Sequence, residues 1–198
     1  MPIAIDVALL LPDAVNALAV ELNRRLDGGT PEGLTLDADH LPHITLAQLF
    51  VAEQSLEELH RTVGGVASSF EAIDLRVSSL DDQSDTVMLV FEEHARLQRL
   101  HAAVMDAVAG LEVPGSAAAF HPDPGGRPAR DRDVAWVTGY RAHHAYGRYL
   151  PHVTVGHGSG APAVAPFSFR ADRLAVCRLG PHCTCRLVLP DPHPLRCR

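Results

Sequence analysis

A short motif occurs twice in this chain, and it constrains the fold more than any other feature. The first copy is Leu-Pro-His-Ile-Thr-Leu at 41–46, and the second is Leu-Pro-His-Val-Thr-Val at 150–155. After the proline, polar and aliphatic residues alternate, which is typical of a strand with one buried face. Proline has no amide donor and is confined to strand starts and edges, so we expect each strand to begin beside its histidine.

The residue types in the motif favour acid–base chemistry on an anion. In a strand, residues two apart face the same way, so each copy presents one imidazole and one hydroxyl together. Histidine titrates near neutrality, so one imidazole can act as general base while its protonated partner acts as general acid. Threonine hydroxyls can donate to the non-bridging oxygens of a phosphodiester. The predicted catalytic residues are therefore His43, Thr45, His152 and Thr154.

Through these two motifs the chain resembles the 2H phosphoesterase superfamily, whose members carry a pair of His-x-Thr/Ser motifs. It looks most similar to the branch of 2′–5′ RNA ligases and RNA 2′,3′-cyclic phosphodiesterases, to which Arg178-Leu179-Gly180 also fits. The resemblance implies an α+β, bilobal fold with a pseudo-twofold axis, in which two largely antiparallel sheets flank a central cleft and helices lie outside. It implies one bilobal domain over residues 1–198, with His152 as the base and His43 as the acid.

Several functions are compatible with such a pair of motifs. The leading one is a metal-independent phosphodiesterase that hydrolyses the 2′,3′-cyclic phosphates of RNA ends or nucleotides to 2′-phosphates. The same residues would serve a 2′–5′ RNA ligase or a 2′–5′ oligonucleotide phosphodiesterase, and a non-catalytic nucleotide- or RNA-end-binding module is a third reading. A fourth reading is a metalloprotein that uses both motif histidines. His40 and His43 form a His-x-x-His pair without an evident third ligand, so we expect neither a metal nor a cofactor.

The composition excludes other classes of protein. All 17 basic residues are arginine, which rules out lysine-adenylate chemistry and a Walker-type lysine. The net charge of −7 is unlike that of a protein with a broadly basic nucleic-acid surface, so arginines would have to gather locally around a phosphate. Asp6 and Asp13 interrupt the apolar N-terminal stretch, so neither a signal peptide nor a membrane span is expected. We expect a cytoplasmic monomer.

The order of the predicted elements also indicates an α+β fold with antiparallel sheets, because strands follow one another with helices interspersed. The predicted strands are 2–11, 43–51, 71–80, 86–91, 134–140, 152–157, 167–179 and 182–189. The predicted helices are 13–27, 55–67 and 94–110.

Four side chains close to the second motif are predicted to bind substrate. Arg148 and Tyr149 directly precede the motif and could meet a phosphate or a base. Trp136, in a predicted strand, could stack on a base. Arg130 lies in the proline- and glycine-rich segment 114–133, which is predicted to be irregular, and could close over an RNA end.

Three other histidines near the second motif are interpreted as incidental. They are His143, His144 and His157. In a regular strand His157 would face the side opposite to His152, because the two lie five positions apart.

Three of the four cysteines surround a predicted tight turn at Gly180-Pro181. With a two-residue turn, Cys177 would pair opposite Thr184, while Cys183 and Cys185 would face the other side of the sheet. That arrangement disfavours a shared metal site, so reduced thiols are expected.

Overall fold

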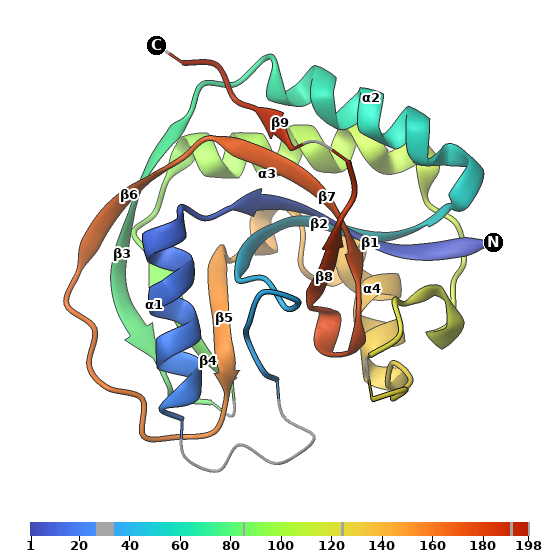
Figure 1. Ribbon diagram of the computed structural model, residues 1–198. Coiled ribbons are helices and arrows are strands. Elements are labelled where there is room, and N and C mark those ends of the chain that lie inside the picture. Colours follow the sequence, from blue (N-terminus) through green and yellow to red (C-terminus); the bar gives the residue numbers. More distant parts are fainter. Residues whose placement is uncertain (27–33, 85, 124, 191, 198) are drawn as a thin grey trace.

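The computed structural model describes residues 1–26, 34–84, 86–123, 125–190 and 192–197 (Figure 1). It shows two antiparallel sheets, so the predicted α+β class is confirmed. The first sheet has the order β2 (His43–Ala52), β1 (Pro2–Leu10), β7 (Arg173–Leu179) and β8 (Cys185–Val188), and β9 (His193–Pro194) also pairs with β7. The second has the order β5 (His152–His157), β4 (Thr86–Phe91), β3 (Ile73–Asp81) and β6 (Phe167–Ala171).

Each sheet carries one motif strand at its edge. The strand β2 begins at His43 and β5 begins at His152, each directly after its proline, as predicted. Each of the two strands is the outermost strand of its sheet, and the two contact each other. The two copies of the motif therefore meet where the edges of the two sheets approach.

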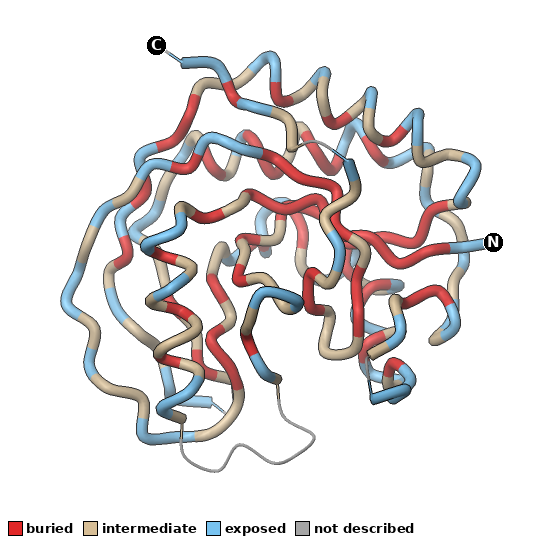
Figure 2. Tube along the Cα trace, in the orientation of Figure 1, coloured by how far each residue is buried: buried red, intermediate tan, exposed pale blue. Residues whose placement is uncertain are grey.

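Four α-helices surround the sheets in the described part of the chain. They are α1 (Asp13–Arg24), α2 (Leu56–Ala67), α3 (Ala95–Val108) and α4 (Asp131–His143). The helix α1 contacts β5, whereas α3 and α4 contact β2 and α2 packs on α3 and β7. Figure 2 shows that the central strands are almost wholly buried between these layers. No helix among the described residues has both the length and the apolar character that crossing a bilayer demands.

Short 3₁₀ helices complete the connections between the larger elements. They are η1 (Glu53–Ser55), η2 (Ala109–Leu111), η3 (Ala117–Ala119), η4 (Tyr146–Arg148) and η5 (Pro181–Cys183). Of these, η4 leads into the second motif, and η5 connects β7 to β8.

The predicted strand 134–140 is wrong, because these residues belong to α4. Asp133, Val137 and Tyr140 are its buried residues, and their spacing of four and three matches one face of a helix. Acidic side chains in its first turn also complement the helix dipole. The apolar run around Trp136 resembles a strand in sequence because most of this helix faces outward or toward the cleft, so it lacks a clear apolar stripe.

The predicted strand 167–179 is two strands, β6 and β7, separated by Asp172. They belong to different sheets, so the chain crosses from one sheet to the other at this residue. The burial pattern changes at the same point, from alternating in β6 to almost continuous in β7. This is the difference expected between a strand with one exposed face and a strand covered on both faces.

The predicted pairing of the cysteines is also wrong. The turn η5 is longer than two residues, and the ladder shifts beside it, so Cys185 pairs with Leu179 and Cys177 pairs with Val188. As a result, Cys177 and Cys185 are buried in the same small cluster rather than on opposite faces. All four cysteines are free thiols.

Candidate active site

The two motifs line one cavity of about 600 Å³. His43 and Thr45 reach it from β2, and His152 and Thr154 reach it from β5. The aliphatic residues that alternate with them are buried in the core, as the strand pattern predicted. The structure thus brings together all four side chains that the sequence singled out.

The two imidazoles are held in the same way. Nδ1 of His43 lies 2.8 Å from the carbonyl oxygen of Leu41, and Nδ1 of His152 lies 2.9 Å from the carbonyl oxygen of Leu150. A carbonyl only accepts, so each Nδ1 carries its proton and donates it. The other ring nitrogen, Nε2, is therefore the one that can exchange a proton with a substrate.

A buried carboxylate, Asp6 of β1, supports the first motif. Its Oδ2 accepts hydrogen bonds from Thr45 Oγ1 and Gln48 Nε2, both at 2.7 Å. Nε2 of His43 lies 3.4 Å from the same oxygen, and the Asp6 side chain is fully buried. Sequence reasoning missed this residue, although a charged side chain in the middle of an apolar strand requires a polar partner and so points to a site.

The surroundings of the two histidines shift their pKa values in opposite directions. Burial alone would lower the pKa of His43, but the charge and hydrogen bonding of Asp6, together with the Leu41 carbonyl, raise it to about 9. Burial lowers the pKa of His152, and the nearby charge of His43 lowers it further. At neutral pH, His43 is therefore protonated and His152 is neutral.

The two threonines are also unequal. The hydroxyl of Thr45 donates its only proton to Asp6, which differs from the expectation that it donates to a phosphate. Within the described part of the chain, the Thr154 hydroxyl makes no such bond. Thr154 is therefore the motif hydroxyl that is free to donate to a ligand in the cavity.

Among the described residues, one group of side chains has the composition of a metal site. A donor atom from each of Asp6, His43 and Cys185 lies within 4.8 Å of the others. The pKa of the Cys185 thiol is raised well above its usual value by burial, so it does not readily supply the thiolate that a metal needs. Asp6 is already bonded to Thr45 and Gln48. We therefore interpret these residues as an acid–base cluster.

Two of the predicted substrate-binding residues precede the second motif, and both line the cavity. Tyr149 is buried, with its hydroxyl donating to the Thr45 carbonyl at 2.8 Å, so it links the two motifs. Arg148 is exposed and donates to the carbonyl of Ala142 at 2.9 Å through one nitrogen only. Arg148 can therefore contact a phosphate, whereas Tyr149 is a structural residue.

The other two predicted residues lie on α4 or at its start. Trp136 is 42% exposed and its ring stacks on His144, with 3.8 Å between the ring centroids. Both rings line the cavity, so His144 lies at the candidate site. Arg130 is the N-cap residue of α4 and forms a two-pronged ion pair with the buried Asp133, which fixes its guanidinium. Arg132, which the sequence also places in the segment that could close over an RNA end, is exposed and lines the cavity.

His157 also lines the cavity, contrary to the expectation from a regular strand. The pairing of β5 with β4 shifts by one residue at Val155, which stands without a partner in the ladder. Such a bulge reverses the alternation of faces. His157 therefore lies on the same side as His152.

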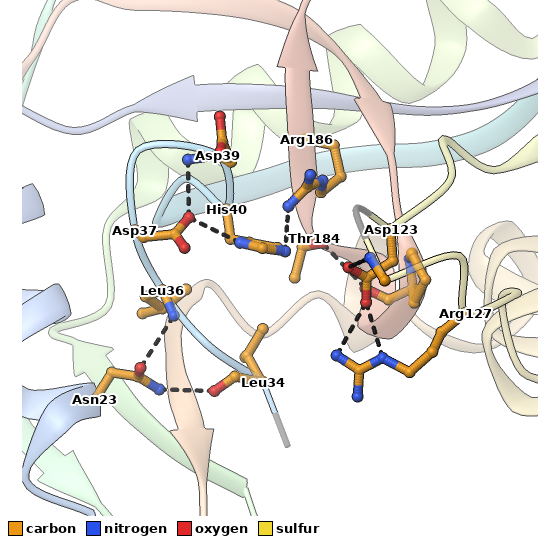
Figure 3. Close-up of polar contacts among 12 residues, drawn as sticks. Asn23, Leu34, Leu36, Asp37, Asp39, His40, Asp123, Arg127, Thr184 and Arg186 are labelled. Carbon is orange, nitrogen blue, oxygen red and sulfur yellow. Dashed lines mark hydrogen bonds and ion pairs between the residues drawn. The ribbon is translucent and has the colours of Figure 1, made fainter. Parts of the chain in front are cut away.

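An apolar wall of the cavity is formed by Leu34, Leu36 and Leu41. Figure 3 shows that side-chain hydrogen bonds hold the segment that carries them at two points. The Asn23 side chain bonds the backbone of Leu34 and Leu36, and it also donates to the carbonyl of Val155 in β5. Further along, His40 bridges Asp37 and Arg186. The wall is thus anchored to both halves of the molecule.

Acid pH should destabilise the protein through the buried His101 of α3. This ring contacts the Leu46 carbonyl, accepts from the Tyr146 amide and stacks on Tyr149, so it joins the two motif regions. Burial is the main cause that lowers its pKa to about 4. An unfolded histidine takes up a proton near pH 6.5, so the stability that the neutral ring provides is complete above that pH and declines down to about 4.

The free energy of unfolding, measured with urea between pH 4 and 7, tests this expectation. In His101→Gln the free energy of unfolding should depend less on pH, with a slope smaller by about 1.4 kcal/mol per pH unit at the steepest point. An unchanged slope in that variant would contradict the role given to His101.

The comparison with known proteins identifies the superfamily of the chain. The fold and the paired motifs are those of the 2H phosphoesterase superfamily. A family model described as the 2′-5′ RNA ligase superfamily matches residues 24–186, so the chain belongs to that superfamily. A search of curated proteins returned no match to this sequence.

Solved structures share the fold at low sequence identity. TT0787 of Thermus thermophilus has a TM-score of 0.62 and 17% identity, with 99% of this chain and 100% of that chain covered. LigT of E. coli in complex with 3′-AMP has a TM-score of 0.61 and 16% identity, with 98% and 99% covered. The phosphate complex of LigT has a TM-score of 0.60 and 14% identity, with 98% of each chain covered.

Proposed function

We propose that this chain is a metal-independent phosphodiesterase that hydrolyses the 2′,3′-cyclic phosphates of RNA ends or nucleotides to 2′-phosphates. The observation that carries the proposal is that both motifs line one cavity with their imidazoles in opposite protonation states at neutral pH. Hydrolysis of a phosphodiester needs one group that accepts a proton from water and one that protonates the leaving oxygen. Two unequal histidines fulfil that requirement.

In this mechanism, Nε2 of His152 accepts a proton from a water molecule as the water oxygen attacks phosphorus. The P–O3′ bond breaks, and Nε2 of His43 gives its proton to the departing 3′-oxygen. The products are a 2′-phosphate and a free 3′-hydroxyl. The proton gained by His152 and the one lost by His43 are then exchanged with solvent. Thr154 donates to a non-bridging oxygen while negative charge develops on it.

The cavity also suits the rest of a nucleotide. Arg132 and Arg148 lie at its exposed side and can attract a phosphate, although the chain as a whole is acidic. The stacked pair of Trp136 and His144 offers a flat surface for a base. The E. coli LigT structures contain 3′-AMP, phosphate and NADP+, which supports nucleotides as the ligand class here.

Cleavage or formation of 2′–5′ linkages is the second candidate, and the description of the matching family favours it. Ligation would keep the roles of the histidines, because a 5′-hydroxyl would then attack the cyclic phosphate in place of water, whereas cleavage of a 2′–5′ linkage back to the cyclic phosphate would reverse them. We also propose that residues 1–198 act as one bilobal domain and as a monomer, because the cavity draws its residues from both sheets of one chain. We propose that the protein is cytoplasmic, because its four free cysteines suit a reducing compartment.

A panel of substrates assayed in excess chelator tests the proposal. It should contain 2′,3′-cyclic nucleotides, oligonucleotides with cyclic ends and 2′–5′ oligoadenylates. We expect hydrolysis of the cyclic phosphates to 2′-phosphates at a rate that the chelator leaves unchanged. Activity that disappears in chelator and returns with a divalent ion would favour the metalloprotein reading instead. Turnover of the 2′–5′ linkages alone would favour the second candidate.

A further inference from the structure

The two halves of the site match residue by residue in their strand pairing. In β1 and β2, Leu10 pairs with His43, and Ala8 pairs with Thr45. In β4 and β5, Val90 pairs with His152, and Met88 pairs with Thr154. Both ladders then shift at the residue after the threonine, which stands without a partner in each strand. The bulge is therefore part of the repeated unit.

Beyond the bulge, the equivalent pairs are Asp6 with Gln48 and Thr86 with His157. Gln48 and His157 both lie five residues after the motif histidine, and both line the cavity. The partner position carries a carboxylate in the first half and a hydroxyl in the second. Asp6 bonds Gln48 at 2.7 Å, and Thr86 lies 3.4 Å from His157 Nδ1, so each cross-strand pair is in contact.

Asp6 is the charged group that faces His43. The other titratable groups around this cluster are Cys177 and Cys185 from the neighbouring strands, Cys183 from η5, Tyr140 from α4, Tyr149 and His152. Burial raises the pKa values of Cys183, Cys185 and both tyrosines, so these groups are neutral at pH 7. The carboxylate is thus the charged difference between the two halves, which also carry Gln48 and His157 at the paired position.

We propose that this one position sets the roles of the two motifs: the Asp6 carboxylate holds His43 as the cationic proton donor, and Thr86 at the equivalent position leaves His152 as the neutral proton acceptor. Asp6 is a positioning residue, because it is fully buried and acts through His43, whose Nε2 lies 3.4 Å from the Asp6 Oδ2. The assignment of roles rests on the proposed function, whereas the effect on the two imidazoles is independent of it.

Asp6→Asn tests the proposal with the charge removed and the shape retained. By NMR of the imidazole protons, His43 should titrate at or below the ordinary histidine pKa of about 6.5 rather than about 9, because burial lowers its pKa once the Asp6 charge is removed. The protonated fraction, and with it kcat/KM, should fall by at least about 30-fold at pH 8 and by a smaller factor at pH 6. The signal is assigned through its absence in His43→Gln.

A carboxylate introduced at the equivalent position of the second half, Thr86, tests the proposal if Asp6→Asn does not fold. Thr86 is only partly buried, and Thr86→Asp should raise the pKa at which His152 titrates. As a matched control, Asp133→Asn removes another buried carboxylate at the cavity, whose charge is already paired with Arg130, and should leave the His43 titration in place. If His43 titrates at the same pH with and without the Asp6 charge, the proposal is overturned. If the titrations move as expected in an inactive protein, the proposed function fails and the electrostatic role of Asp6 stands.

Discussion

Replacing either motif histidine with alanine should lower the turnover of a 2′,3′-cyclic nucleotide by about 10²–10⁴-fold, because each removes one partner of the proton transfer. His152→Ala removes the neutral imidazole that accepts the proton of water. His43→Ala removes the cation that protonates the leaving oxygen. The two losses should not add in the double variant, because neither imidazole completes the reaction without the other.

His60→Ala is the matched control for these variants. His60 lies on α2, where its ring faces His193 and does not line the cavity. Its replacement should leave turnover unchanged. Circular dichroism and thermal unfolding should show that all the variants fold. Wild-type turnover by a folded His43→Ala or His152→Ala protein on every substrate would exclude the two-histidine mechanism.

The motif strands and their inward-facing residues could be predicted from the sequence because the information is local. Pro42 and Pro151 mark where each strand begins, and the alternation that follows fixes which side chains share a face. That the two strands converge could be predicted from the chemistry of the motif and from the resemblance to a known superfamily.

The helix α4 could not be recognised in the same way because its pattern depends on its surroundings. Its polar and aromatic side chains face the cleft, and Asp133 occupies a buried position that is apolar in most helices. The charge of Asp133 is balanced by Arg130, a partner that the pattern of apolar residues does not reveal.

The position of His157 and the role of Asp6 depend on pairing between strands. A bulge reverses the faces of a strand, and the residue types of Val155 and Gly156 do not predict one. Gly156 does have a structural role, because it lies so close to Asn23 that a larger side chain would clash. Asp6 is separated from His43 in sequence and becomes its neighbour only through the pairing of β1 with β2. The residue types indicated the candidate chemistry of this site. The difference between its two halves could be recognised only from the pairing of the strands.

The difference between the two halves also predicts unequal effects of the two motif threonines on kcat. Thr154→Val should lower kcat by about 10²–10³-fold, because it removes the hydroxyl that is free to stabilise charge on the phosphate oxygen. Valine has nearly the same shape and suits a strand, so the fold should tolerate it. Thr45→Val should cost less in kcat, because the Thr45 hydroxyl already donates to Asp6.

The comparison is made from kcat and KM for a cyclic nucleotide at a pH where His43 is protonated and His152 is neutral. Thr154→Ser serves as the matched control, since it retains a donor at the same position and should keep most of the activity. Loss of activity in Thr154→Ser as severe as in Thr154→Val would show that the methyl group, and not the hydroxyl, matters. Equal losses in Thr45→Val and Thr154→Val would mean that Thr45 leaves Asp6 during the reaction and that both hydroxyls donate to the phosphate.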